Sequence, residues 1–153
     1  MTAAPFGRFF LPGPTEVHQD VLAALTHPMI PHRGRDMTEL LGRVADPLKR
    51  LFRTRRTVLV GTCSATGFME MAVRCGARQR VLSLVGGAFG DRFAGIAAAC
   101  GRDVVRLNVS LGQTVEPDML RDALKRSEVD AVTLVHSETS TGALAPLQEL
   151  AAV

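Results

Sequence analysis

The stretch VLSLVGGAFGDRFAGIAAACG, residues 81–101, decides the fold class of this chain. It opens with the apolar run Val81–Val85, which has the length and composition of a buried strand. The glycine-rich loop Gly86–Gly90 follows, and the spacing then predicts a helix over Asp91–Cys100 that ends at Gly101. A strand that leads through a short loop into a helix is the repeating unit of a parallel sheet.

The same alternation continues on both sides of this stretch. Further strands are expected at Thr57–Cys63, Val104–Val109 and Ala131–His136. Further helices are expected at Ala65–Cys75 (closed by Gly76), from about Pro117 to Arg126, and from Leu147 onward. Because the strands are almost wholly apolar, helices should cover both faces of the sheet. The predicted fold class is therefore α/β, with a mostly parallel sheet sandwiched by helices.

The residues before Thr57 follow a different pattern. Residues 1–14 are rich in proline and glycine and predict an extended arm. A short helix is expected over about Glu16–Leu25, and a loop over Met29–Arg35. A longer amphipathic helix then begins near Asp36, with Pro47 as a possible kink. Its apolar side carries Met37, Leu40, Leu41, Val44, Leu48 and Leu51.

Composition narrows the class of protein. The 153 residues, 46% of them hydrophobic, fit one domain, and no apolar run is long enough to span a membrane. Met1–Arg8 lacks the order of a signal peptide, and three cysteines without CxxC spacing indicate reduced thiols, so a cytoplasmic protein is expected. The net charge is +3, and much of it lies in one basic cluster. Phe52 is the only aromatic residue in this cluster, and aromatic residues are needed to stack on bases. The cluster therefore indicates a solvated helix end or a subunit contact rather than a nucleic-acid site. That cluster comprises Arg43, Lys49, Arg50, Arg53, Arg55 and Arg56.

Three loops after predicted strands should meet at one edge of the sheet, where ligands bind. In Gly61–Gly67, the hydroxyls of Ser64 and Thr66 and the free N–H groups of a helix start suit a phosphate, although Ser64 is also an ordinary helix cap. In Gly86–Gly90, Phe89 is flanked by glycines and suits a flat ligand or, alternatively, packing on the next helix. The loop 136–142 is dense in hydroxyls that bind a ligand or cap the backbone.

A single ligand with a phosphate, an aromatic ring and polar ring substituents would explain all three loops, and pyridoxal 5′-phosphate has those parts. The chain resembles the class V aminotransferases of fold type I, most closely the alanine/serine–glyoxylate (or pyruvate) group. The resemblance is carried, in the family order, by Leu11-Pro12-Gly13-Pro14-Thr15, His32-Arg33, Ser64-Ala65-Thr66-Gly67-Phe68-Met69-Glu70, Gly87-Ala88-Phe89-Gly90-Asp91-Arg92 and His136-Ser137-Glu138-Thr139-Ser140-Thr141-Gly142.

The resemblance implies a role for each of these motifs. Ser64, Ala65 and Thr66 would hold the cofactor phosphate. Phe89 would stack on the pyridine ring, and Thr139 would hydrogen-bond near its phenolic oxygen. Gly13 would meet the substrate carboxylate, whereas His136 and Glu138 would shape their loop rather than take part in catalysis. Residues 36–153 would belong to the large cofactor-binding domain, residues 1–35 would form the arm and short helix, and the enzyme would be a homodimer.

The resemblance places the lysine that forms a Schiff base with the cofactor beyond residue 153. The only lysines present, Lys49 and Lys125, do not follow a strand into the predicted site, and Asp130 precedes its strand and so lies at the opposite edge. We therefore expect no catalytic residue and no metal site among these residues, which should be inactive alone.

The predicted function is transfer of the amino group of a small amino acid, such as alanine or serine, to a 2-oxo acid such as glyoxylate or pyruvate. Neither a nucleic acid nor a membrane is an expected partner. A lyase or desulfurase of the same class would share these loops, and a non-catalytic domain that binds a phosphate ligand is a further alternative. A serine hydrolase is disfavoured because the chain lacks Gly-x-Ser-x-Gly around Ser64.

Overall fold

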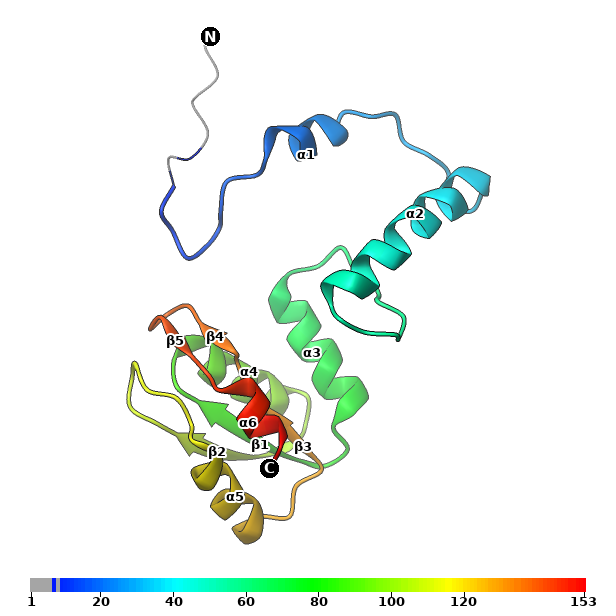
Figure 1. The fold of residues 1–153 in the computed structure, drawn as a ribbon. Helices are drawn as coiled ribbons and strands as arrows, with labels where there is room; N and C mark the ends of the chain where they lie inside the picture. Colours follow the sequence, from blue (N-terminus) through cyan, green and yellow to red (C-terminus); the bar gives the residue numbers. More distant parts are fainter. Residues whose placement is uncertain (1–6, 8) are drawn as a thin grey trace. The chain divides into compact units, whose positions relative to one another are not determined.

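The computed structural model describes residue 7 and residues 9–153, and divides the chain into two compact units, Met1–Thr62 and Cys63–Val153. Figure 1 shows both units, coloured along the sequence. Residues 1–6 and 8 lie outside the described residues. They belong to the predicted arm and to Met1–Arg8, the segment that lacks the order of a signal peptide.

The first unit contains two helices, α1 (Gln19–Ala24) and α2 (Arg35–Leu51). Helix α1 is shorter than expected because the ring of His18 caps it: the Nδ1 atom accepts a hydrogen bond from the Asp20 amide at 3.3 Å. Helix α2 confirms the expected amphipathic helix, and it continues through Pro47.

The strand expected at Thr57–Cys63 is a wrong prediction, because this segment forms no strand in the structure. Leu59 and Val60 are 76% and 69% exposed, and neither described sheet pairs with them. The run has the apolar, β-branched composition of a strand, but a strand is stabilised only when a neighbour satisfies its backbone groups.

The second unit is built on a parallel sheet of β1 (Arg80–Val85), β2 (Asp103–Asn108) and β3 (Ala131–Thr133), in the order β2-β1-β3. Leu82 of the central strand pairs in register with Val105 on one side and Val132 on the other. Strand β1 is buried from its second residue onward, as expected for a strand with neighbours on both edges and helices on both faces. The predicted α/β class is confirmed.

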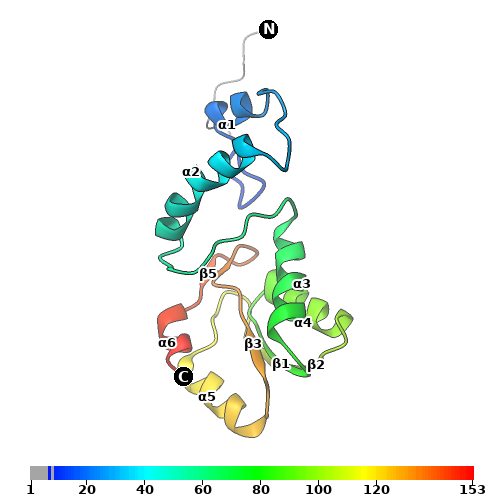
Figure 2. The ribbon, with the colours of Figure 1, turned by 90° about the vertical axis from the view of Figure 1, so that its right-hand side faces the viewer.

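Two layers of helices cover this sheet (Figure 2). One face packs on α3 (Ala65–Gly76) and α4 (Ala88–Ala99), through a core that includes Val73, Val81 and Ala97. The other face packs on α5 (Pro117–Arg126) and α6 (Leu147–Ala151), through a core that includes Leu82, Leu84, Leu120 and Leu150. Neighbouring residues of β1 point to opposite faces, so Val81 and Leu82 belong to different cores.

The segment after β3 also corrects the sequence prediction. The strand expected to reach His136 ends at Thr133. The expected loop, which ended at Gly142, instead supplies β4 (Ser137–Glu138) and the turn of an antiparallel hairpin, whose second strand β5 (Ala143–Leu144) follows it. The Glu138 carbonyl oxygen closes its turn by accepting the Gly142 amide at 2.9 Å, and Gly142 has a φ of +77°, which glycine adopts readily. Among the described helices, none is both long and apolar enough to cross a membrane.

Candidate functional site

Helix α4 begins at Ala88, three residues earlier than the predicted start at Asp91. Gly87, the residue before it, has no side chain to cap the helix, and the caps come instead from the β4–β5 hairpin. The Ser140 hydroxyl accepts the Ala88 amide at 3.0 Å. The Glu138 carboxylate accepts the amides of Phe89 at 3.0 Å and Gly90 at 2.9 Å. These acceptors satisfy amides that a helix start leaves without partners, and they extend α4 by almost one turn.

Glu138 is the most buried ionisable residue of this edge, with an exposed fraction of 5%. Its Oε1 atom also accepts the Ser140 hydroxyl at 2.6 Å and the Ser140 amide at 3.3 Å. Burial by itself raises the pKa of this carboxyl group. The hydrogen bonds from Ser140, Gly90 and Phe89 outweigh burial, so that the pKa of Glu138 lies below its ordinary value. Glu138 is therefore a buried carboxylate that shapes the loop, as expected from the sequence.

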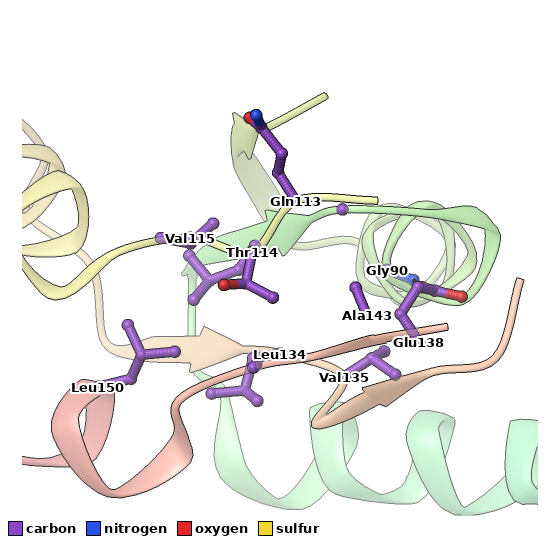
Figure 3. Close-up of a pocket in the computed structure, with 12 residues that line it drawn as sticks. Gly90, Gln113, Thr114, Val115, Leu134, Val135, Glu138, Ala143 and Leu150 are labelled. Atoms are coloured by element: carbon purple, nitrogen blue, oxygen red, sulfur yellow. Dashed lines mark hydrogen bonds between the residues drawn. The ribbon is translucent and has the colours of Figure 1, made fainter. Parts of the chain in front are cut away.

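The glycines of this region allow the helix, the strand and the hairpin to approach closely. A Cβ atom on Gly90 would lie 2.9 Å from the Leu84 carbonyl oxygen of β1, and one on Gly87 would overlap the Glu138 side chain. Figure 3 shows Gly90 and Glu138 side by side at the border of a small pocket lined mainly by apolar side chains. The glycines of 86–90 are thus explained by packing within the protein.

The start of α3 differs from that of α4. Ser64 caps α3 by accepting the Gly67 amide at 3.3 Å with its hydroxyl, and its carbonyl oxygen accepts the Phe68 amide at 3.2 Å. The amides of Ala65 and Thr66 have no acceptor among the described residues. Of the two helix starts, only that of α3 therefore keeps N–H groups available for an anion.

Helix α3 and the hairpin lie at the same edge of the sheet. The connection from α3 to β1 is short, residues 77–79, so the helix runs back along the strand and its start lies toward the carboxyl end of β1. Figure 2 shows this arrangement. Asp130 lies at the other edge, where its carboxylate accepts the amides of Arg78 (2.9 Å) and Gln79 (2.7 Å), as its position before the strand predicted.

The remaining predicted ligand residues are half-buried or exposed in the structure. Phe89 is half-buried, and the guanidinium carbon of Arg92 lies 5.0 Å from its ring centroid. Thr139 is exposed in the hairpin turn, and its hydroxyl group has no hydrogen-bond partner within the described part of the chain. Gly13 is exposed in the first unit. The described residues include no cluster of His, Cys, Asp and Glu that could hold a metal ion.

Comparison with known proteins relates this geometry to a class of enzyme. No family model matches the chain. An uncharacterized aminotransferase of Methanocaldococcus jannaschii is 40% identical over 146 residues, which are 94% of this chain and 38% of the relative. The crystal structure of an aspartate aminotransferase of subgroup IV from Thermus thermophilus superposes with a TM-score of 0.83 at 38% identity, covering 93% of this chain and 40% of that one.

The serine–glyoxylate aminotransferase of Methylorubrum extorquens is 31% identical over 139 residues, which are 87% of this chain and 35% of the relative. These relatives of the chain are class V-type aminotransferases. The resemblance to that class is thereby confirmed. The chain spans less than half the length of each of these three class V-type relatives.

Class V-type aminotransferases use pyridoxal 5′-phosphate, so the predicted cofactor is confirmed for the family. The donor set of this chain fits the group: two amides at the start of α3 and the Thr139 hydroxyl, which have no partner among the described residues, and an aromatic ring at the start of α4. Sequence reasoning missed Ser140, and it missed that Glu138 caps α4. One signal was present, since Gly87 supplies no side-chain cap to a helix that begins directly after it.

Proposed function

We propose that this chain forms part of a pyridoxal-phosphate-dependent aminotransferase that acts on small amino acids, such as alanine or serine, and on 2-oxo acids such as glyoxylate or pyruvate. The observation that supports it most is the contrast between two helix starts at one sheet edge. The first amides of α4 are capped by Glu138 and Ser140, whereas those of Ala65 and Thr66 in α3 meet no acceptor in the part of the chain that the structure describes.

The proposal gives each predicted site residue a role toward the cofactor or the substrate. The amides of Ala65 and Thr66, with the hydroxyls of Ser64 and Thr66, would hold the phosphate group. Phe89 would present a ring face to the pyridine, and Thr139 would donate a hydrogen bond near its phenolic oxygen. Gly13 would contact the substrate carboxylate through its backbone. When bound, pyridoxal phosphate supplies the carbonyl group that takes up the amino group of the substrate.

Neither lysine of the chain is proposed to form the Schiff base with the cofactor. Lys49 belongs to α2, and Lys125 lies in α5, where it pairs with Asp122 at 3.2 Å. We therefore propose that residues 1–153 bind the cofactor without catalysing transfer by themselves. The proposal also includes residues 36–153 as part of the cofactor-binding domain, a homodimer as the assembly, and a cytoplasmic location in keeping with three free cysteines.

Two other functions share part of the evidence. A lyase or desulfurase with the same cofactor would use the same loops. A non-catalytic domain would bind the phosphate group alone, at the same α3 amides. Adding a small amino acid distinguishes these two functions from an aminotransferase. Only an aminotransferase converts the cofactor to its amino form and then restores the aldehyde form when a 2-oxo acid is added.

The experiment is a titration of a protein that carries this chain with pyridoxal 5′-phosphate, followed by absorption spectroscopy. We expect a near-visible band, which shifts when alanine or serine is added and returns with glyoxylate if the catalytic lysine is also present. Replacing both Ser64 and Thr66 with alanine should weaken binding by about 1–3 kcal/mol. The matched control replaces Ser110 and Thr57, which lie outside the predicted site. Equal binding by the two double variants would contradict the phosphate assignment.

A further inference from the structure

Two residues of the β4–β5 hairpin hold the first turn of α4 in place. Ser140 accepts the Ala88 amide, and Glu138 accepts the next two amides, those of Phe89 and Gly90. The chain distance across these contacts is 48 to 52 residues, so the hairpin and the helix are joined by tertiary contacts alone. Phe89 and Thr139, the two residues proposed to contact the cofactor ring, lie one on each side of this junction.

We propose that Glu138 and Ser140 are a positioning pair that fixes the Phe89 ring and the Thr139 hydroxyl relative to one another for the cofactor. This inference rests on the proposed function, since it gives the pair a role toward the same ligand. Neither residue would touch the reacting atoms. Each would act through the backbone segment that it holds.

Only a carboxylate suits the place that Glu138 occupies. Four donors converge on it: the amides of Phe89, Gly90 and Ser140, and the Ser140 hydroxyl group. A carboxylate accepts about four hydrogen bonds and donates none. A glutamine of the same shape would place an NH₂ group against at least one of these N–H donors. The exchange to glutamine should therefore loosen the junction although it changes few atoms.

The packing around the pair leaves little room for another arrangement. A Cβ atom on Gly87 would lie 2.6 Å from the Ser140 hydroxyl oxygen and as close to the carboxyl carbon of Glu138. Thr139 stands between the two anchored residues, so its backbone is fixed on both sides. Phe89 is anchored by its own amide, and the stacked Arg92 limits its ring from one face.

The test compares Glu138→Gln and Ser140→Ala with the control Glu128→Gln, which removes the same charge from an exposed side chain. The first readout, without cofactor, is amide hydrogen exchange by NMR. We expect Glu138→Gln to speed exchange at Phe89 and Gly90 at least tenfold, and to leave the core amides of Leu82 and Ser83 unchanged. Ser140→Ala, a milder change, should speed exchange at Ala88.

The second readout is binding of pyridoxal 5′-phosphate, with the circular dichroism of its absorption band. Glu138→Gln should weaken binding about tenfold and reduce the induced dichroism, which reports the asymmetric environment of the ring. Ser64→Ala should weaken binding with little change in exchange at Phe89. Glu138→Asp, which keeps the charge, should restore part of the dichroism, whereas a purely structural carboxylate would affect only stability.

Three results are informative against the inference. Unchanged exchange at Phe89 and Gly90 in Glu138→Gln would overturn the anchoring itself. Faster exchange with unaltered affinity and dichroism would show that the junction does not position the cofactor. Absence of binding by the unsubstituted protein would refute the proposed function and, with it, the role toward the cofactor, while the exchange data would still measure the anchor.

Discussion

A Cβ atom on Gly87 would lie 2.5 Å from the Cγ atom of Glu138, a separation so short that one of the two residues would have to shift. The hairpin carboxylate therefore requires glycine at the position before α4. This relationship joins residues that are 51 positions apart in the sequence, and it explains the glycine at position 87.

Gly87→Ala should destabilise the protein by roughly 1–3 kcal/mol, because the methyl group would displace Glu138 and break the caps on α4. The matched control is Gly95→Ala within α4, where an added Cβ meets no atom within 4 Å. That change should be stabilising, by up to about 1 kcal/mol, because alanine favours a helix interior. Urea unfolding of both variants measures the difference. Equal stability of the two would show that the hairpin tolerates the methyl group.

The stability of the protein should fall in acid partly because of Glu138. Its pKa in the folded protein lies below the ordinary glutamate value of about 4.3, since its hydrogen bonds outweigh the burial that raises it. As pH falls below the ordinary value, the unfolded chain takes up a proton before the folded one does, so unfolding becomes more favourable. The stabilisation is complete above that value and is lost as pH passes through the folded pKa.

As pH falls below the ordinary glutamate value of about 4.3, the free energy of unfolding should therefore decrease more steeply in the unsubstituted protein than in Glu138→Gln. The two curves should approach each other at low pH, where the carboxyl group is protonated in both states. Parallel curves would mean that Glu138 has the same pKa in the folded and unfolded chain.

Asp130→Ala should lower the melting temperature and leave cofactor affinity unchanged. Its carboxylate accepts the amides of Arg78, Gln79 and Arg80, which depress the pKa of Asp130 and lie at the edge of the sheet away from the hairpin. Asn at this position should retain part of the stability because its amide oxygen still accepts. A loss of cofactor binding at unchanged stability would contradict this structural assignment.

Replacing Phe89 distinguishes a stacking residue from a packing residue. If its ring stacks on the cofactor, Phe89→Leu should lose roughly 0.5–1.5 kcal/mol of binding, whereas Tyr and Trp should be tolerated. If its ring only packs within the protein, Leu should be mild and Trp should lower the melting temperature through overpacking. Cofactor affinity and melting temperature for Ala, Leu, Tyr and Trp decide between these. Wild-type behaviour of Leu in both measurements would remove Phe89 from the site.

The sequence by itself determined the elements whose signals are local. The apolar run Val81–Val85 matches β1 within one residue, and Pro117–Arg126 matches α5 at both ends, because proline suits the first turn of a helix and the basic residues Lys125 and Arg126 its last. The strand–helix alternation was sufficient to predict the parallel sheet with helices on both faces. The order of the motifs was sufficient to predict the similarity of the chain to class V aminotransferases.

Only the tertiary structure decided where α4 begins, which of two helix starts keeps free amides, and that residues 57–63 form no strand. The acceptors for the α4 amides come from the hairpin, and no local pattern near Gly87 names them. A strand likewise depends on a neighbour that lies elsewhere in the chain, so Leu59 and Val60 read as a strand and yet remain exposed. Backbone hydrogen bonds are satisfied in three dimensions, and for that reason composition and spacing predict the elements better than they predict their ends and partners.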